Sequence, residues 1–409
     1  MSLVRPFAAH LPAPAYASAV VSPPLGRLTT REWLELSEGN PHSYLHVIRT
    51  EVDTEEGGAD QHLEHTSGRL RLLQLIDTGV FLPPSRPAFY VYGIDEGDIH
   101  AVGIVAEVDV AGYTDGRILR HEHTRTATED LLLSHLRLVG AHSDPVALTY
   151  RSDAALEAVV AGLRLRPPDL AFQAVDGAGQ QVWVVDDPTH VALLQERLDA
   201  IDTLYITDGH HRCAAALRYA EGRRRENTGH RGDEPYNFVL AALFGETELR
   251  LREFNRCVRS DDTTPDEIVA ALGRTVRLDA VSSPEAARPH RAGEAGLVTG
   301  GCGYRFTLPP AAAGANPADA LDASRLQTGV LGPVFGITDP RTDRRLHYVA
   351  GGESVHPAHH HCVACFLLHP TTVTDVMRVA DAGLVMPPKS TWFEPKVRGG
   401  LFVTLLDEL

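Results

Sequence analysis

The stretch TLYITDGHHRCAAAL, residues 203–217, most tightly constrains what this chain can fold into. A run of β-branched and aromatic residues ends at Asp208, and an alanine-rich run follows a few residues later. Because β-branched and aromatic residues favour strands and Ala favours helices, the order predicts a strand, a tight turn and a helix. Gly209 suits the turn because glycine adopts backbone conformations that other residues avoid.

The predicted helix begins among polar side chains: His210, His211 and Arg212. The first N–H groups of a helix have no partner within it, and the positive end of the helix dipole lies there. A guanidinium adds a fork of donors that matches a phosphate. We therefore predict a phosphate site at the start of this helix, beside His210, His211 and Arg212. The simpler interpretation is a helix capped by Asp208 and followed by exposed basic side chains.

Helical and strand patterns alternate along the rest of the chain and predict a mixed α/β fold. The predicted helices are 29–40, capped by Thr29 or Thr30, and 67–81, 152–163, 188–201 and 372–383. The predicted strands are 41–50, a hairpin of 88–94 with 100–110, then 170–175, 181–187, a pair of 236–244 with 249–258, and 361–370. Residues 51–65 and 222–235 are predicted loops. We divide the chain into a mixed α/β region 1–150, a phosphate-binding core 151–260 and an α/β region 261–409.

Charge and apolar patterning exclude several classes of protein. A formal net charge of -16 argues against general binding to nucleic acid, which requires an excess of basic residues. No apolar run is long enough to cross a bilayer, and prolines interrupt the N-terminal stretch, so no secretory signal is expected. Five scattered cysteines do not resemble a disulfide framework, which favours a reducing cytoplasm. A homodimer is left open.

Five separated motifs carry a resemblance to a known family. They are DGHHRCAAAL, YNFVLAALF, GNPHSYLHVIR, DGRILRHEHTR and MPPKSTWFEPKV, and by them the chain is identified as a member of the family named domain of unknown function ten-fifteen. The resemblance covers nearly the whole chain. In VVSPPLGRLT the chain departs from the family, because Leu25 and Gly26 stand where members commonly have Tyr and Asp.

The Gly-His-His-Arg turn also resembles the phosphate-binding turn of the ParB and sulfiredoxin superfamily. The free serine kinases of that superfamily, which make O-phospho-L-serine from L-serine and a nucleotide, have similar turns. The resemblance implies a nucleotide-binding core in which Gly209, His211 and Arg212 contact phosphates of ATP or ADP. It further implies that Asp208 or His210 acts on the acceptor hydroxyl or on a metal.

Two further motifs supply candidate residues. In RHEHTR, an extended backbone would place His121, His123 and Arg125 on one face as substrate contacts, with Glu122 as a general base or, together with Asp208, a Mg²⁺ ligand. The alternative is a polar edge strand. In MPPKSTWFEPK, prolines stiffen a segment that is predicted to bind the nucleotide anion, and the alternative is a loop that packs its aromatic residues. Its candidates are Lys389, Ser390, Thr391 and Lys396.

The histidine- and cysteine-containing stretch HPAHHHCVACFLLH, 356–369, is predicted to be a loop leading into a buried strand, with a zinc site as the alternative. Taken together, the sequence predicts a soluble nucleotide-dependent phosphotransferase that acts on a small hydroxylated metabolite, with a serine kinase as the leading case. One alternative is a phosphatase or a phospho-amino-acid-dependent enzyme that uses the same anion site. The other is a ParB-like nucleotide-binding regulator.

Overall fold

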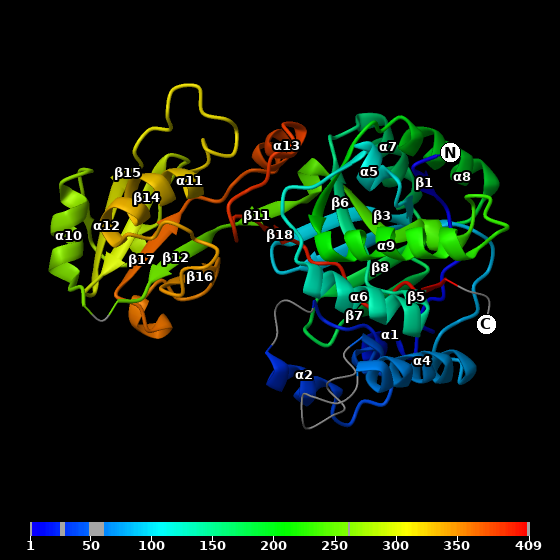
Figure 1. Cartoon of the computed structure of the whole chain (residues 1–409). Helices are drawn as coiled ribbons and strands as arrows, with labels where there is room; N and C mark the ends of the chain where they lie inside the picture. The colour runs from blue at the N-terminus through cyan, green and yellow to red at the C-terminus, as the bar shows by residue number, and fades with distance from the viewer. Residues whose placement is uncertain (1, 25–28, 49–60, 261, 407–409) are drawn as a thin grey trace. The chain divides into compact units, whose positions relative to one another are not determined.

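A computed structural model describes residues 2–24, 29–48, 61–260 and 262–406, so Leu25, Gly26 and most of the predicted loop 51–65 lie outside the described residues. The predicted mixed α/β fold is confirmed. The chain forms two compact units, and each is described by itself (Figure 1). The first unit comprises Met1–Leu119, His123–Leu249 and Pro395–Leu409, and the second comprises Arg120–Glu122 and Arg250–Glu394. The units cut across the predicted ranges 1–150, 151–260 and 261–409, because strands from the first two ranges share one sheet.

A nine-stranded sheet forms the centre of the first unit, in the order β4-β9-β6-β10-β3-β2-β8-β7, with β1 paired to β3. The predicted hairpin is confirmed as antiparallel β2 and β3, and β10 pairs parallel with β6. The strands are β1 Val4–Arg5, β2 Phe89–Glu96, β3 Ile99–Asp109, β4 Ile118–Leu119, β6 Val146–Tyr150, β7 Leu170–Gln173, β8 Gly179–Val185, β9 Leu204–Asp208 and β10 Phe238–Gly245. A second, two-stranded sheet pairs β5 Ala141–His142 with β19 Thr404–Leu405.

Helices pack their apolar sides on this sheet. Cys213, Ala216 and Ala220 of one helix join Ile206 and Leu243 of the sheet in a buried cluster. Small residues on that helix let its backbone approach the strands closely, and Figure 1 shows it lying across the sheet. The helices of this layer and its surroundings are α5 Gly112–Asp115, α6 Thr126–Val139, α7 Ala154–Leu163, α8 Pro188–Asp199 and α9 His210–Glu226.

Three N-terminal helices contribute to a separate buried cluster with Phe81 and Val403: α1 Ala17–Val20, α3 Leu45–Ile48 and α4 Gln61–Asp77. A further helix, α2 Thr30–Ser37, lies between α1 and α3 in the sequence. The predicted cap of α2 is confirmed, because the Thr29 side chain accepts from the Glu32 N–H in a capping box. The strand predicted for 41–50 is wrong. Instead, Tyr44 and Val47, three residues apart and so on one side of a helical turn, join the buried cluster, and the Ser43 hydroxyl accepts from the Leu45 N–H at the start of the turn.

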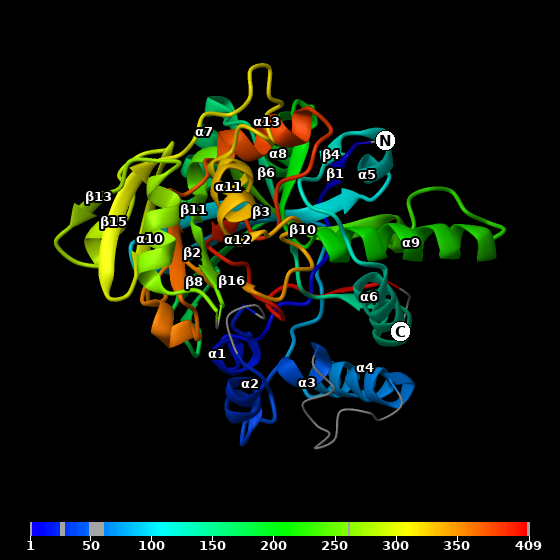
Figure 2. The ribbon, with the colours of Figure 1, turned by 60° about the vertical axis from the view of Figure 1, so that its left-hand side comes forward.

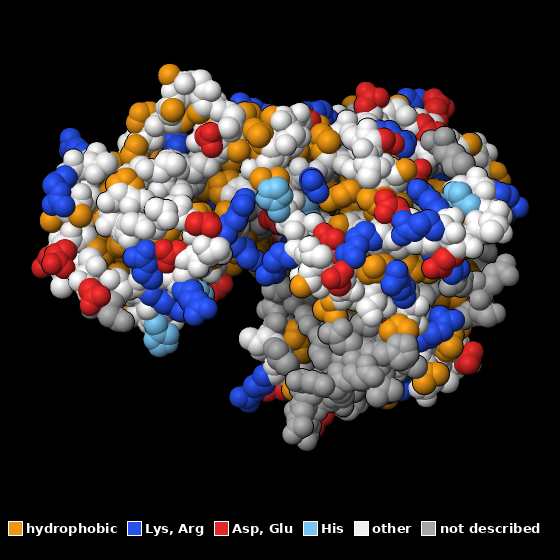
Figure 3. Space-filling view, in the orientation of Figure 1, with side chains coloured by type: hydrophobic (Ala, Val, Ile, Leu, Met, Phe, Trp, Pro, Cys, Tyr) orange, Lys and Arg blue, Asp and Glu red, His pale blue; other side chains and the backbone are white. Residues whose placement is uncertain are grey.

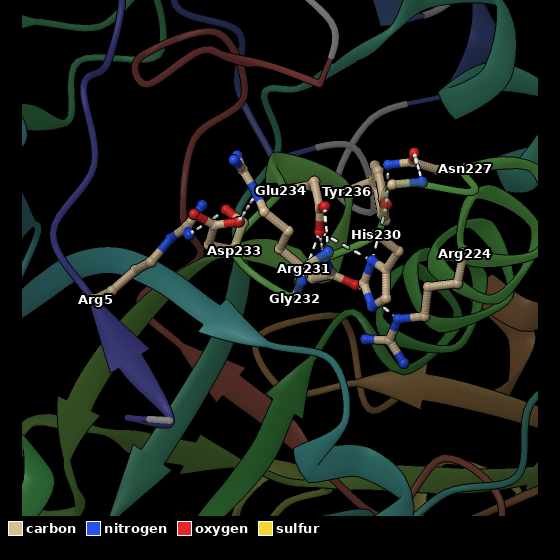
Figure 4. Close-up of polar contacts among 11 residues, drawn as sticks. Arg5, Arg224, Asn227, His230, Arg231, Gly232, Asp233, Glu234 and Tyr236 are labelled. Carbon is tan, nitrogen blue, oxygen red and sulfur yellow. Dashed lines mark hydrogen bonds and ion pairs between the residues drawn. The ribbon is translucent and has the colours of Figure 1, made fainter.

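The predicted polar loop after α9 is closed by the carboxylate of Glu234 (Figure 4). Glu234 accepts from the N–H groups of Arg231 at 2.7 Å and Gly232 at 2.9 Å. Burial on its own raises the pKa of Glu234, but these backbone donors and His230 outweigh it and lower the pKa to about 2. An ionised carboxylate therefore holds this loop at neutral pH.

The second unit contains a six-stranded sheet in the order β13-β15-β14-β17-β12-β16 and a two-stranded pair, β11 with β18. Helix α10 and two short helical segments cover one face of the larger sheet (Figure 2). The strands are β11 Arg250–Arg252, β12 Phe254–Val258, β13 Asp279–Val281, β14 Glu294–Thr299, β15 Cys302–Thr307, β16 Leu346–Ala350, β17 Ala364–Leu368 and β18 Trp392–Glu394. The helices are α10 Pro265–Gly273, α11 Asp322–Leu326, α12 Gly332–Phe335 and α13 Val373–Asp381.

Strand partners in this unit correct two predictions. The pairing of 236–244 with 249–258 is wrong, because β12 pairs with β16 and β17, which come from much later in the chain. The expectation that the cysteines are not cross-linked is wrong for Cys257 and Cys365, which face each other on β12 and β17 and form a disulfide. Spacing along the sequence does not show which strands will become neighbours.

Candidate functional site

The predicted strand, turn and helix at 203–217 are confirmed. Asp208 ends β9, Gly209 adopts the left-handed conformation with φ +94°, and His210 begins α9. A Cβ atom on Gly209 would lie 2.9 Å from both Nε and Nη2 of Arg212. Glycine is therefore required both for the turn and for the guanidinium that folds back over it. The first hydrogen bond of the helix joins the Cys213 N–H to the Gly209 carbonyl at 2.9 Å, so the amides before it have no acceptor within the helix.

Arg212 is held by an aspartate that sequence analysis missed. Its Nη1 forms an ion pair with the Asp144 carboxylate and lies 3.3 Å from the Asp144 carbonyl oxygen. Burial alone lowers the pKa of Arg212, but Asp144 and Asp208 outweigh it and raise the pKa, so the guanidinium stays charged. Asp144 lies two residues before the strand β6, and nothing in its sequence context marks it out.

Asp208 is held by Lys396, a residue predicted from a distant motif. The Lys396 Nζ donates to the Asp208 Oδ2 at 2.9 Å. Burial on its own raises the pKa of Asp208, but Lys396 and then Arg212 outweigh it and lower the pKa to about 2. The structure thus brings together two of the predicted segments, and the Asp208 side chain, 39% exposed, remains accessible to solvent.

A β-bulge lies at the end of β9, directly before Asp208. Ala147 pairs with Asp208 and Leu148 pairs with Ile206, so Thr207 is an extra residue on β9. The Thr207 hydroxyl donates to the Ala147 carbonyl at 3.0 Å and fixes the bulge. Bulges re-aim the side chains beside them, and here the bulge directly precedes Asp208.

The two histidines of the motif differ in exposure and partners. His210 is 5% exposed and lies close enough to Asp208 to help lower the pKa of that carboxyl. His211 accepts the N–H of Arg125 at its Nε2, at 3.0 Å. Burial and the positive charge of Arg125 lower the pKa of His211, so its ring is neutral with the proton on Nδ1. Arg125, one of the residues predicted in RHEHTR, therefore contacts His211 of the Gly-His-His-Arg turn.

The final segment of the first unit supplies a buried cation that sequence analysis also missed. Arg398 is fully buried, forms an ion pair with Asp176, and places Nη2 3.3 Å from Glu96 Oε2. After it, Gly400 donates to the Ser143 carbonyl at 2.8 Å, next to Asp144. The two basic residues Lys396 and Arg398, close together at the end of the motif, were the available signal.

Other predicted residues belong to the second unit. Residues 120–125 form neither a strand nor a helix, since β4 ends at Leu119 and Arg125 is the residue directly before α6. His121 is 1% exposed, and its Nε2 lies 3.2 Å from the Thr391 hydroxyl. Glu122 belongs to the same unit, whereas His123 belongs to the first. The roles predicted for these residues stay predictions.

The Lys389, Ser390 and Thr391 segment contains an arginine contact that the sequence did not single out. Arg256 on β12 is 4% exposed and donates from Nη2 to the Ser390 hydroxyl and the Pro388 carbonyl, each at 3.3 Å. The Lys389 Nζ lies 5.6 Å from the centre of the Phe254 ring. Burial lowers the pKa of Arg256 to about 10, which keeps it charged at neutral pH.

Within the described ranges, no three His, Cys, Asp or Glu side chains are grouped as metal ligands. Asp208 and Asp144 provide two carboxylates that share the Arg212 charge. A cavity of ≈ 890 Å³ lies between α7 and α8, and none of the predicted site residues lines it.

On the face shown in Figure 3, basic and acidic side chains are interspersed over α6 and α9, as in the Arg218 ion pairs with Glu129 and Asp130. No helix among the described segments is long and apolar enough to span a membrane.

The model of the family described as "Protein of unknown function (DUF1015)" matches residues 4–324, so the chain belongs to this family. No curated protein matches the chain.

Three solved structures show distant likeness. A mutant free serine kinase in complex with ADP is 11% identical, with a TM-score of 0.34 over 71% of this chain and 87% of that one. SbnI with a C-terminal truncation from Staphylococcus aureus is 11% identical, with a TM-score of 0.38 over 74% and 87%. A conserved hypothetical protein from Pyrococcus furiosus is 11% identical, with a TM-score of 0.33 over 71% and 90%. At these TM-scores, we draw no argument from the three structures.

Proposed function

We propose that this family member binds a nucleotide at the start of α9 and transfers its terminal phosphoryl group to a small hydroxylated metabolite, with L-serine as the first candidate. The observation that carries the proposal is the position of Arg212. Its guanidinium lies over the left-handed Gly209, beside the first amides of a 17-residue helix. The resemblance of this turn to those of free serine kinases supports the same assignment.

Phosphate oxygens would be bound by the helix amides and by Arg212. The ion pair with Asp144 occupies only part of the guanidinium, which has five N–H donors. His211 adds a neutral ring whose Nδ1–H can donate, since its Nε2 accepts from Arg125. These donors lie within one helical turn, and phosphoryl transfer depends mainly on such positioning and charge neutralisation.

Two carboxylates suit a divalent cation that would accompany the nucleotide. Mg²⁺ is usually bound through one or two carboxylates, phosphate oxygens and water, so Asp208 and Asp144 are a sufficient protein donor set. Asp208, with a pKa lowered to about 2, is ionised at neutral pH. When bound, the cation would neutralise charge on the phosphates. Glu122, in the second unit, remains a predicted ligand or base.

The acceptor hydroxyl would be oriented by Asp208 or His210. The hydroxyl oxygen forms a bond to the terminal phosphorus while the bond from that phosphorus to the nucleotide diphosphate breaks. Asp208 accepts the hydroxyl hydrogen bond, but its low pKa means that the proton passes on to solvent. A weak base is adequate because phosphoryl transfer passes through a loose transition state.

Calorimetry with ATP and ADP, with and without Mg²⁺, tests the binding step. We expect Arg212→Gln to lose at least tenfold in ATP affinity, since a charge-assisted contact to phosphate is removed. Arg218→Gln is the matched control, because Arg218 lies on the same helix and pairs with Glu129 and Asp130 on the surface. Equal ATP affinity in Arg212→Gln and the wild type would refute the binding site.

Phosphorus NMR of the protein with ATP, Mg²⁺ and a panel of hydroxylated amino acids tests the transfer step. We expect a new phosphomonoester signal with one of them and none with Arg212→Gln. If O-phosphoserine binds but no nucleotide does, the site belongs to a phosphatase or a phospho-amino-acid-dependent enzyme. If nucleotide binds and no acceptor is phosphorylated, a regulator is favoured.

A further inference from the structure

A second polar cavity lies in the first unit, at the carboxyl ends of the parallel strands β6 and β10. Their last residues, Tyr150 and Gly245, pair directly, and a cavity of ≈ 130 Å³ opens beside them. Ligands of α/β proteins commonly bind outside the carboxyl ends of parallel strands. This end of β6 is opposite to the end that follows Asp144, so the cavity is separate from the proposed phosphate site.

Tyr150 is a buried side chain that lacks a hydrogen-bond partner. The residue is 4% exposed and lines the cavity, and across the described part of the chain its hydroxyl makes no hydrogen bond. Its oxygen is not among the fully buried side-chain atoms, so it remains accessible from the cavity and can hydrogen-bond to a ligand there. Burial, followed by the negative charges of Glu157 and Glu248, raises the pKa of Tyr150. The hydroxyl thus lies in a negative field and stays protonated.

Three oxygen atoms surround one point at the mouth of this cavity: Tyr150 and the exposed Glu157 line the cavity, and the exposed Ser152 lies beside it. A Cβ atom on Gly245 would lie 3.8 Å from each of Tyr150 Oη, Ser152 Oγ and Glu157 Oε1. Glycine leaves that point open. On the neighbouring wall, the Glu248 carboxylate is fixed by the Val102 N–H, which donates to it at 2.7 Å. The convergent groups are therefore two hydroxyls and two carboxylates.

We propose that this cavity binds a primary ammonium group carried on a short apolar chain. An ammonium has three N–H donors and a full positive charge, which match three convergent oxygens in a negative field. The carbon chain would contact Ile104, Val160 and Ala161, which also line the cavity. The proposal is independent of the phosphotransferase assignment.

The same ammonium chemistry occurs in alkylamines and in α-amino acids. Arg164 also lines the cavity, and its guanidinium lies 5.3 Å from the centre of the Trp183 ring. An amino acid could direct its carboxylate to Arg164, whereas an alkylamine would gain nothing there. Propylamine and L-alanine therefore distinguish the two sources, and propionate serves as the control that lacks an ammonium.

The experiment is calorimetry on the full chain with these three compounds and with KCl. We expect propylamine or L-alanine to bind and propionate not to bind. Gly245→Ala should weaken the affinity at least tenfold, because its methyl group occupies the convergence point at ordinary contact distances. Gly273→Ala, at a site where a Cβ would meet nothing within 4 Å, is the matched control.

Tyr150→Phe provides a second variant if Gly245→Ala does not fold. It removes a hydroxyl that has no described partner, so the melting temperature should stay the same or rise while amine affinity falls several-fold. Absence of amine binding to the wild type would overturn the proposal. So would binding of K⁺ alone, or unchanged affinity in both variants.

Discussion

The two units stabilise their buried arginines in opposite ways. In the first unit, Arg398 is fully buried and forms ion pairs with Asp176 and Glu96, and Arg212 pairs with Asp144. In the second unit, Arg256 is 4% exposed and, among the residues that the structure describes, has no carboxylate partner. It donates instead to the carbonyls of Phe254 and Pro388 and to the Ser390 hydroxyl.

This difference predicts that substituting a buried arginine lowers the free energy of unfolding by different amounts in the two units. Removing one member of a buried ion pair leaves the other charge without compensation, which is strongly destabilising. Removing a guanidinium whose partners are carbonyls, a hydroxyl and the Tyr348 ring leaves only neutral groups, which costs less stability. The motif MPPKSTWFEPKV and the residue after it supply side chains to both units. Ser390 contacts Arg256 in the second unit, whereas Lys396 and Arg398 belong to the first.

The largest expected effect is therefore that of Arg398→Met. We expect it to lower the free energy of unfolding of the first unit by about 3 kcal/mol, because two carboxylates lose their cation and the packed guanidinium is lost. Urea denaturation with hydrogen exchange of β8 peptides would measure it. Arg31→Met is the control, because Arg31 forms an exposed ion pair with Glu35 and should change stability by less than about 0.5 kcal/mol. An effect of Arg398→Met as small as this control would contradict the buried ion-pair network.

Arg256→Met should have a smaller effect, about 1–2 kcal/mol on the second unit. The methionine keeps most of the apolar contact area, and the loss is that of hydrogen bonds to carbonyl and hydroxyl groups. Hydrogen exchange of peptides from β12 and β17 would follow it. A loss larger than that of Arg398→Met would show that Arg256 has a charged partner, and the comparison between the units would fail.

Local sequence signals predicted the elements that local interactions determine. The β9, Gly209 and α9 corner follows from strand propensity, a residue with φ +94° and an alanine-rich helix. The cap of α2 follows from Thr29 and Glu32, three residues apart. The helical turn at Leu45–Ile48 was missed because packing in the N-terminal cluster overrides the preference of Val47 for strands.

Partners that come from distant parts of the chain could not be predicted in the same way. Asp144 lies 68 residues from Arg212 in sequence, and Asp208 lies 188 residues from Lys396. Lys396 was identified only because its motif is rich in donors, and Arg256 lies in a buried strand, β12, with no such signal. The local sequence therefore predicted where along the chain the candidate site lies. It could not predict which distant residues compensate the charges there, because the tertiary fold brings those residues together.

The smallest effect on stability, and the sharpest test of charge compensation, is expected for Lys396→Met. In the wild type the pKa of Asp208 is lowered to about 2, below its unfolded value of about 3.9. Its contribution to stability is therefore fully present above about pH 4 and is lost as the pH falls toward 2. Without Lys396, burial has only Arg212 and His210 to oppose it, so the pKa of Asp208 should rise and protonation should begin at higher pH.

Carbon NMR of aspartate labelled at the carboxyl carbon would measure this titration directly. Asp343 is the internal reference from the second unit, because the side chain of Arg345 lowers the pKa of that carboxyl and Lys396→Met should leave it unchanged. Lys396→Arg should keep the pKa of Asp208 low, since it retains the charge. If Lys396→Met leaves the pKa of Asp208 unchanged, Arg212 and His210 are enough to compensate this carboxylate. Asp144 and Asp208 would then share the Arg212 guanidinium. The claim that each buried charge of the first unit has its own oppositely charged partner, unlike Arg256 in the second, would be wrong.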